Sequence, residues 1–318
     1  MGSQPLSLAE LRQQALAWLT PIYPLAEAQA LVRRLLRHFL PDWEQRWLTS
    51  GGKAPFPLSL YASWQRALQR LQNREPLAYI LGQVEFAGLR LCLRPGVFIP
   101  RPETEEWALW TVKRLAPAPP QTILDIGTGS GALALLFARA FPAAQVYAVD
   151  RSPFACQTAR ANARRLGLNL HLACLTFGQS PLPSSWPLRW DLILANPPYI
   201  PWTYWEATDL AVRAYEPPEA LFCHDTTLYK GIAEFAATHL TSTGAGVVEL
   251  FPPLAQEVKA LFEASGLLTE LHCDFSGRPR WLWFQRNEKQ ALIQSSPPNS
   301  LGEAIENKPN KLTSLPSA

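Results

Sequence analysis

From residue 121 to residue 285, short aliphatic runs typical of strands alternate with other segments. Most of these other segments have apolar residues at helical spacing. The runs cover residues 123–126, 146–150, 170–175, 192–195, 246–250, 267–273 and 281–285. Strands that alternate with helices along a chain form a mainly parallel sheet with helices on both faces. The sequence therefore predicts an α/β fold built on a doubly wound, Rossmann-like sheet of seven strands.

The chain before this region has the pattern of a small helical bundle. Ser7 and Glu10 are spaced as a capping box, and apolar residues at helical spacing follow over residues 8–19, 28–39, 43–48 and 59–71. A turn at Ala87 and Gly88 separates two short strands at residues 83–86 and 89–93. We expect a helical domain at 1–80, a β-hairpin linker at 81–100, the α/β domain at 101–286 and a disordered tail at 287–318.

Charge and cysteine content argue against several kinds of protein. The 318 residues carry a formal net charge of +3, which is too small to indicate direct nucleic-acid binding. The five cysteines are scattered and form no Cys-x-x-Cys pair, so neither a disulfide framework nor a zinc site is expected. We find no signal-peptide pattern and no apolar run of about 18 residues. The sequence thus predicts a cytoplasmic protein with no metal and no membrane contact.

Three glycines follow the first strand of the α/β region and precede its helix. In Gly127-x-Gly129-x-Gly131 the backbone can turn tightly and approach a ligand closely. Asp150 ends the next strand, where a carboxylate can bind ribose hydroxyls. This pattern suits NAD as well as S-adenosylmethionine. Asp125 favours S-adenosylmethionine, because its carboxylate can accept from the ammonium group of a methionine moiety and NAD carries no such cation.

The stretch Asn196-Pro197-Pro198-Tyr199 directly follows the aliphatic run at 191–195. The prolines end the sheet ladder and restrict the backbone, so the Asn196 amide is held at the carboxyl end of a strand, where open α/β sheets bind ligands. The Asn196 side-chain oxygen and the Pro197 carbonyl can hold both hydrogens of a planar NH2 group, and Tyr199 can stack on it. The pattern indicates positioning of an amide or exocyclic-amine nucleophile. The alternative is a turn with an Asn cap.

Together these motifs resemble those of the peptide chain release factor N5-glutamine methyltransferases, the PrmC/HemK family of class I S-adenosylmethionine-dependent enzymes. The resemblance covers about residues 5–286. It rests on residues 74–82 (REPLAYILG), 99–105 (IPRPETE), 125–131 (DIGTGSG), 196–200 (NPPYI) and 212–217 (VRAYEP). The NPPY stretch is shared with adenine-N6 methyltransferases, whereas the 99–105 segment beside a helical N-terminal domain is far more specific.

The resemblance implies both a reaction and the residues that carry it. The substrate is the glutamine of a Gly-Gly-Gln tripeptide in a translation release factor, and its amide nitrogen receives the methyl group. The family's fold is a seven-stranded class I methyltransferase sheet with a helical N-terminal domain that helps to dock the release factor. The implied cofactor-binding residues are Asp125, Gly127, Thr128, Gly129, Ser130, Gly131, Asp150, Phe177 and Asn196. The implied catalytic residues are Asn196, Pro197 and Tyr199, and the glutamine is bound by Asn196, Pro197, Pro198 and Tyr199.

Other functions stay open at this point. The family has an acidic residue before the aromatic Phe177, and this chain has Thr176, which supports a release-factor-binding protein without catalysis. An adenine-N6 methyltransferase requires a basic target-recognition region of domain size, and the sequence shows none. NAD-dependent reduction is a further alternative. Arg213 and Glu216 are interpreted as a structural ion pair or a loop brace, in preference to a contact with the substrate.

Overall fold

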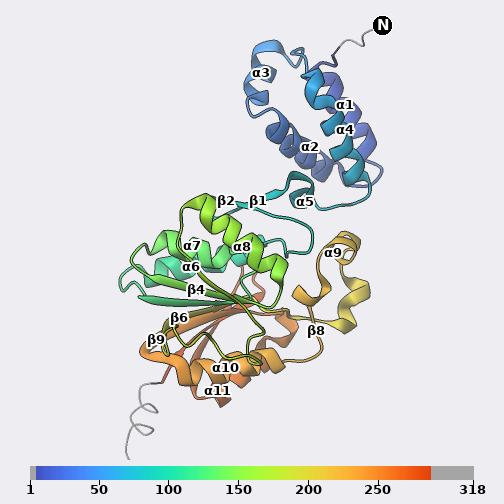
Figure 1. Ribbon diagram of the computed structural model, residues 1–318. Coiled ribbons are helices and arrows are strands. Elements are labelled where there is room, and N and C mark those ends of the chain that lie inside the picture. The colour runs from blue at the N-terminus through green and yellow to red at the C-terminus, as the bar shows by residue number, and fades with distance from the viewer. Residues whose placement is uncertain (1–4, 288–318) are drawn as a thin grey trace, which may run out of the picture.

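The computed structural model describes residues 5–287, and it places a helical bundle beside a larger α/β part (Figure 1). Within these residues no helix combines the length and the apolar character needed to cross a bilayer. The tail predicted as disordered, residues 287–318, lies outside the described residues apart from Asn287.

The bundle consists of four helices, and a fifth, short helix leads out of it. These are α1 to α5: Leu8–Leu19, Leu25–Phe39, Trp43–Ser50, Leu58–Gln72 and Leu77–Leu81. The capping box is confirmed, because the Ser7 hydroxyl accepts from the Glu10 amide and the Glu10 carboxylate accepts from the Ser7 amide. The apolar faces of the helices share one core, in which Phe56 and Trp64 are almost completely buried.

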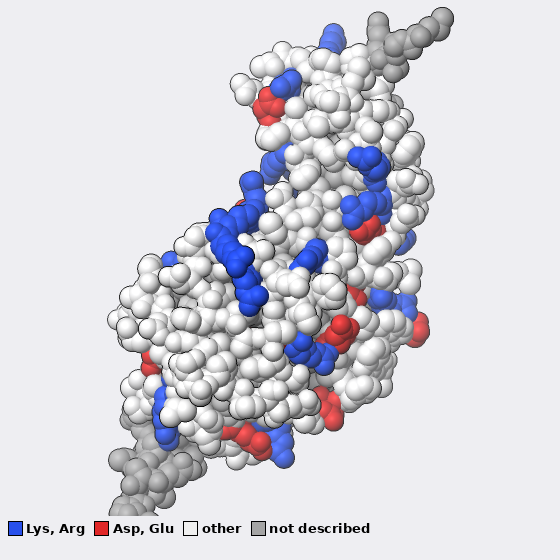
Figure 2. Space-filling model, in the orientation of Figure 1, with Lys and Arg blue, Asp and Glu red and all other residues white. Residues whose placement is uncertain are grey.

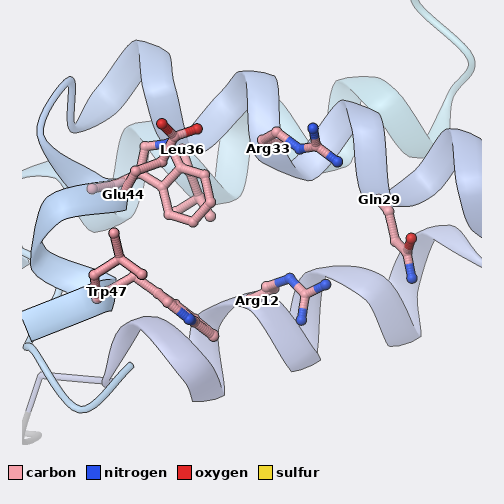
Figure 3. A pocket seen from close by; sticks show the side chains of 8 residues that line it. Arg12, Gln29, Arg33, Leu36, Glu44 and Trp47 are labelled. Carbon is pink, nitrogen blue, oxygen red and sulfur yellow. The ribbon is translucent and has the colours of Figure 1, made fainter. Parts of the chain in front are cut away.

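A hollow of about 510 Å³ opens on this bundle between α1, α2 and α3 (Figure 3). Arg12 of α1 and Arg33 of α2 lie on opposite sides of it, and Trp47 of α3 lies at one end. The Arg12 guanidinium is 5.8 Å from the centroid of the Trp47 ring. Because the hollow lies in the bundle and not at the strand ends, it is separate from the site that the sequence predicts.

The hairpin linker and the sheet follow the predicted pattern. Strands β1 (Gln83–Phe86) and β2 (Leu89–Cys92) pair antiparallel around a turn at Ala87 and Gly88, both with positive φ. One sheet then contains seven strands in the order β10-β11-β9-β6-β3-β4-β5. Their bounds from β3 to β6 are Thr122–Ile126, Gln145–Asp150, His171–Cys174 and Trp190–Ala195, and from β9 to β11 Leu240–Glu249, Leu267–Cys273 and Pro279–Arg286.

The sheet is mainly parallel, as predicted. β5, β4, β3, β6 and β9 pair in parallel along the sheet, and β11 is antiparallel to both β9 and β10. Helices α6 (Pro102–Leu115), α7 (Ala132–Ala140) and α8 (Pro153–Leu166) cover one face, and α10 (Thr227–His239) and α11 (Ala255–Ala264) cover the other (Figure 1). The predicted doubly wound α/β fold is therefore confirmed.

Between β6 and α10 the chain forms short elements to which the sequence analysis assigned no structure. They are β7 (Ile200–Pro201), η1 (Trp202–Ala207), α9 (Leu210–Tyr215), η2 (Pro218–Ala220) and β8 (Phe222–Cys223). The Tyr215 hydroxyl donates to the Asn73 carbonyl just beyond α4, so this segment contacts the bundle. Arg213 and Glu216 do not pair with each other, although each forms an ion pair with another residue. Arg213 pairs with Glu206 on η1, and the buried Glu216 pairs with Arg101 at the start of α6.

Gly246 in β9 offers a test of the packing of this sheet. A Cβ at this position would lie 2.2 Å from the Phe284 ring and 2.7 Å from the Ile193 carbonyl oxygen. Because Phe284 is fully buried, Gly246→Ala should lower the free energy of unfolding by about 3 kcal/mol. In α10, a Cβ on Gly231 meets nothing within 4 Å, so Gly231→Ala should raise that free energy by up to about 1 kcal/mol. Chemical denaturation measures both, and an unchanged Gly246→Ala variant contradicts the argument.

Candidate active site

Asn196 lies directly after β6, at the carboxyl edge of the sheet. Its side-chain Nδ2 donates to Thr104 Oγ1 on α6 at 3.0 Å. The Thr104 hydroxyl has a single hydrogen, which it donates to Glu249 Oε2 at 2.7 Å. Since this hydroxyl can then only accept, Asn196 must turn its NH2 towards Thr104 and its carbonyl oxygen Oδ1 away. The network therefore leaves Oδ1 as the free end of the amide, which is the orientation that an acceptor clamp requires.

Glu249 fixes this arrangement from the end of β9, the strand next to β6. It is fully buried, and Oε2 also accepts from the Trp107 indole N–H at 2.8 Å. The other oxygen, Oε1, accepts from the Tyr199 hydroxyl at 3.0 Å. Burial raises the pKa of Glu249, and these donors act in the opposite direction because they favour the ionised form. The Glu249 carboxylate thus orients Tyr199 directly, and it orients Asn196 indirectly through the Thr104 hydroxyl.

Tyr199 is held at both its backbone and its hydroxyl. Its N–H donates to the Leu221 carbonyl at 3.2 Å, next to the β7–β8 pairing, and its hydroxyl donates to Glu249 Oε1. Burial, followed by the negative charge of Glu249, raises the pKa of the Tyr199 phenol well above its usual value, so the phenol stays neutral. The ring is half-buried, Pro197 is buried and Pro198 is half-buried. The structure therefore brings the predicted clamp residues together, and their catalytic roles stay predictions.

The glycine loop lies on the neighbouring strand ends, as the sequence analysis expected. Gly127, Gly129 and Gly131 all have positive φ, which glycine adopts without strain. The Gly129 N–H donates to Asp150 Oδ2 at 2.8 Å, and the Ser152 N–H donates to Asp150 Oδ1 at 2.8 Å. The Asp150 carboxylate thus braces the loop and the start of α8, and each of its oxygens has a further lone pair for a ribose hydroxyl.

Asp125 carries a buried carboxylate oxygen that suits a cationic group. Its Oδ2 accepts from the Thr128 hydroxyl at 2.6 Å and from the Ala134 N–H at 3.1 Å. Its Oδ1 is buried and has no hydrogen-bond partner among residues 5–287, and the same holds for the Ser130 hydroxyl in the glycine loop. A buried carboxylate oxygen without a partner is costly, and an ammonium group would satisfy it. The residues present therefore fit S-adenosylmethionine.

Phe177, unlike the other predicted residues, packs among apolar side chains of the core. It lies just beyond β5, and its ring packs edge-on against Phe235 of α10 with 5.1 Å between centroids. It belongs to the apolar layer between the sheet and α10 and α11. Its predicted contact with the cofactor stays a prediction.

The protonation of Asp125 gives the cofactor site a predicted pH dependence. Burial raises the pKa of Asp125 to about 7, although the hydrogen bonds from Thr128 and Ala134 lower it. Affinity for S-adenosylmethionine should therefore fall as pH drops below about 7, approaching tenfold per pH unit. In the absence of cofactor the folded chain binds this proton more tightly than the unfolded chain, so stability should fall as pH rises from about 4 to 7.

Calorimetric titration and chemical denaturation between about pH 5.5 and pH 7.5 measure these two dependences. Asp125→Asn is the control, because it keeps an acceptor for Thr128 and Ala134 but cannot ionise. This variant should bind the cofactor weakly at every pH and lose both slopes. An unchanged pH profile in the variant assigns the titration to another group.

Sequence reasoning missed Thr104, Trp107 and Glu249 as members of the site. Glu249 carried a usable signal, since it is an acidic residue at the end of an aliphatic strand, as Asp125 and Asp150 are. Thr104 lies in the 99–105 segment on which the resemblance rests, but nothing in the sequence places it beside Glu249, about 145 residues away. Trp107, also on α6, carried no signal. Among residues 5–287 no group of three or more His, Cys, Asp and Glu side chains is arranged to hold a metal ion.

Comparison with known proteins identifies the family. The model of the PrmC N-terminal domain matches residues 10–82, and that of the methyltransferase small domain matches residues 88–206. The release factor glutamine methyltransferase of Deinococcus radiodurans is 34% identical over 292 residues, which cover 88% of this chain and 99% of that protein. The chain belongs to the release factor glutamine methyltransferase family. Another member, from Moorella thermoacetica, is 37% identical over 231 residues, 71% of this chain and 80% of that protein.

Membership in the release factor glutamine methyltransferase family confirms the resemblance that the motifs indicated, and makes this chain an S-adenosylmethionine-dependent enzyme. Solved structures that resemble it include the 16S rRNA N2 G1207 methyltransferase of T. Thermophilus with AdoMet and guanosine, at a TM-score of 0.46 and 19% identity, covering 64% of this chain and 50% of that chain. A ribosomal protein L11 methylase from Lactobacillus delbrueckii has a TM-score of 0.45 at 21% identity, and the match covers 60% of this chain and 82% of that chain.

Proposed function

We propose that this enzyme methylates the side-chain amide nitrogen of the glutamine in the Gly-Gly-Gln motif of a translation release factor. The observation that carries the proposal is the orientation of Asn196. Its NH2 is bonded to Thr104, so its carbonyl oxygen is the end offered to a substrate. A carboxamide NH2 is a pair of donors in one plane, and it matches two neighbouring acceptors. The relatives named as release factor glutamine methyltransferases support the same substrate.

The residues of the site would act mainly by positioning. Asn196 Oδ1 and the Pro197 carbonyl hold the two amide hydrogens, which turns the nitrogen lone pair towards the reacting carbon, and Tyr199 limits rotation of the flat group. When bound, S-adenosylmethionine would supply an electrophilic methyl group on a positively charged sulfur, and this charge would be lost on transfer. Apolar surroundings, such as the buried Pro197 and the half-buried Tyr199 ring, therefore do not oppose the reaction. No side chain is assigned as a general base, because the methylated amide nitrogen is acidic enough to lose its proton to water.

The residues that hold the cofactor would be those of the glycine loop and its neighbours. Asp125 Oδ1 binds the ammonium group, Asp150 binds the ribose hydroxyls, and the positive φ of Gly127, Gly129 and Gly131 lets the backbone approach closely. The bundle formed by α1 to α4 helps to dock the release factor. We also propose a cytoplasmic location, since all five cysteines are free, which is typical of a reducing compartment.

Transfer of a tritiated methyl group onto a purified release factor tests the proposed function. Label should appear on the wild-type release factor and not on a version whose tripeptide glutamine is replaced by alanine. Label on an oligonucleotide and not on the release factor would instead identify an adenine-N6 methyltransferase. Binding of the release factor without label on either substrate would favour a non-catalytic binding protein.

A further inference from the structure

A groove between β2 and α8 is lined by Arg94, and further exposed arginines lie on the two elements that flank it. Its volume is about 340 Å³, and its lining residues are Cys92, Leu93, Arg94, Gln157, Thr158 and Ala161. On β2, Leu91 is buried while Arg90 is exposed, and Arg94 is exposed two residues beyond the end of the strand. On α8, Arg160 and Arg164 are exposed and lie one turn apart. We call the groove together with these four flanking or lining arginines the arginine groove.

No ion pair within the described residues neutralises the arginine groove, although Glu85 is the cross-strand neighbour of Arg90. Across residues 5–287, none of Arg90, Arg94, Arg160 and Arg164 forms an ion pair. Arg94 bonds to neutral groups, among them the Thr158 hydroxyl at 3.0 Å. Figure 2 shows Lys and Arg side chains gathered as a stripe over α8 and the hairpin, with few acidic side chains beside them. A concave surface of one sign attracts an occupant of the opposite sign.

The arginine groove also runs between the two regions that the proposed function assigns to the release factor. α8 begins just after Asp150, at the edge of the sheet that carries Asn196. Its 14 residues extend for about 21 Å away from that edge. The hairpin on the other side of the groove contacts the bundle, where Gln83 Nε2 lies 3.3 Å from His38 Nδ1 of α2. A protein bound at both Asn196 and the bundle therefore has this groove beside it.

We propose that the arginine groove binds an acidic face of the protein substrate, an inference that rests on the proposed function. Arginine suits this partner, because its planar guanidinium pairs with carboxylates through two parallel hydrogen bonds. RNA is the other polyanion to consider. The groove lining contains no aromatic ring on which a base can stack. The ring of Phe154, at the start of α8, already has the Arg94 guanidinium over it, 5.8 Å from the ring centroid, so this face is not free for a base. An acidic protein surface therefore fits better than a nucleic-acid strand.

Charge reversal at two arginines tests the proposal. In the full-length enzyme, Arg160→Glu/Arg164→Glu should raise the KM for unmethylated release factor by about tenfold or more and leave kcat and the Kd for S-adenosylmethionine unchanged. The same variant should weaken direct binding of the release factor, measured by calorimetry, and flatten the dependence of KM on salt. Lys113→Glu/Lys259→Glu is the matched control, because it changes net charge equally on α6 and α11. Its KM should equal that of the wild type.

The outcomes separate this inference from the proposed function. If the wild-type enzyme does not label the release factor, the proposed function fails and the inference fails with it. If the wild type is active and both charge-reversal variants have the same KM, the arginine groove has no role in binding the substrate. If release factor kinetics are unchanged but the groove variant loses affinity for a single-stranded RNA oligonucleotide, the groove is a nucleic-acid surface and the proposal is wrong. Melting temperatures confirm that both variants are folded.

Discussion

Replacing Asn196 with alanine is expected to lower kcat for glutamine methylation by about 10²- to 10³-fold, while the Kd for S-adenosylmethionine changes by less than about tenfold. The variant removes one of the two acceptors that hold the substrate amide, so the nitrogen lone pair is no longer directed at the methyl carbon. The cofactor keeps its proposed contacts with Asp125, Asp150 and the glycine loop. Single-turnover methyl transfer measures the first effect, and calorimetric titration measures the second.

Thr104→Val is the matched variant for this argument, because it leaves Asn196 in place but removes the hydroxyl that sets the direction of its amide. The Asn196 amide can then turn over and present donors where the substrate also has donors. We expect a loss in kcat of about tenfold, smaller than for Asn196→Ala. An Asn196→Ala enzyme that retains wild-type kcat would show that the amide is held by other groups and that the proposed clamp is incorrect.

Glu249→Ala is expected to have the second large effect, on both stability and activity. Glu249 accepts hydrogen bonds from Thr104, Trp107 and Tyr199 inside the protein. Without the carboxylate these buried donors lose their acceptor and a cavity is left, so the free energy of unfolding should fall by about 3 to 5 kcal/mol. Chemical denaturation measures this loss. In the fraction that stays folded, kcat should also fall, because Asn196 and Tyr199 lose their common support.

Trp107→Phe separates the two consequences of losing Glu249. It removes one donor to Oε2 and leaves Thr104 and Tyr199 bonded to the carboxylate. The expected result is a loss of about 1 to 2 kcal/mol of stability with kcat nearly unchanged. Glu249→Gln, which keeps the shape but introduces an NH2 among donors, should be intermediate in stability and impaired in kcat. If Glu249→Gln has full activity, the carboxylate does not orient Asn196.

Local chemistry in the sequence determined the elements and the place of the reaction. The capping box at Ser7 and Glu10 and the turn at Ala87 and Gly88 are set by contacts within a few residues, so they could be predicted from short patterns. The positions of the strands could also be predicted from their aliphatic runs, but the length of β9 could not, since it begins at Leu240 and not at residue 246. The same holds for Asn196, because a strand followed by two prolines fixes where its backbone lies. The alternation of strands and helices was enough to predict the α/β class, which the structure confirms.

Tertiary structure alone decided how the site is held together. Glu249 meets Thr104 and Tyr199 because β9 lies beside β6 and α6 packs over their ends, and neither fact can be derived from local spacing. The partners of Arg213 and Glu216 could not be predicted for the same reason, since nearness in sequence says little about which charged side chains meet once α6 and η1 are in place. Backbone conformation depends on neighbouring residues, whereas a buried polar group takes whatever partner the packing of distant segments provides.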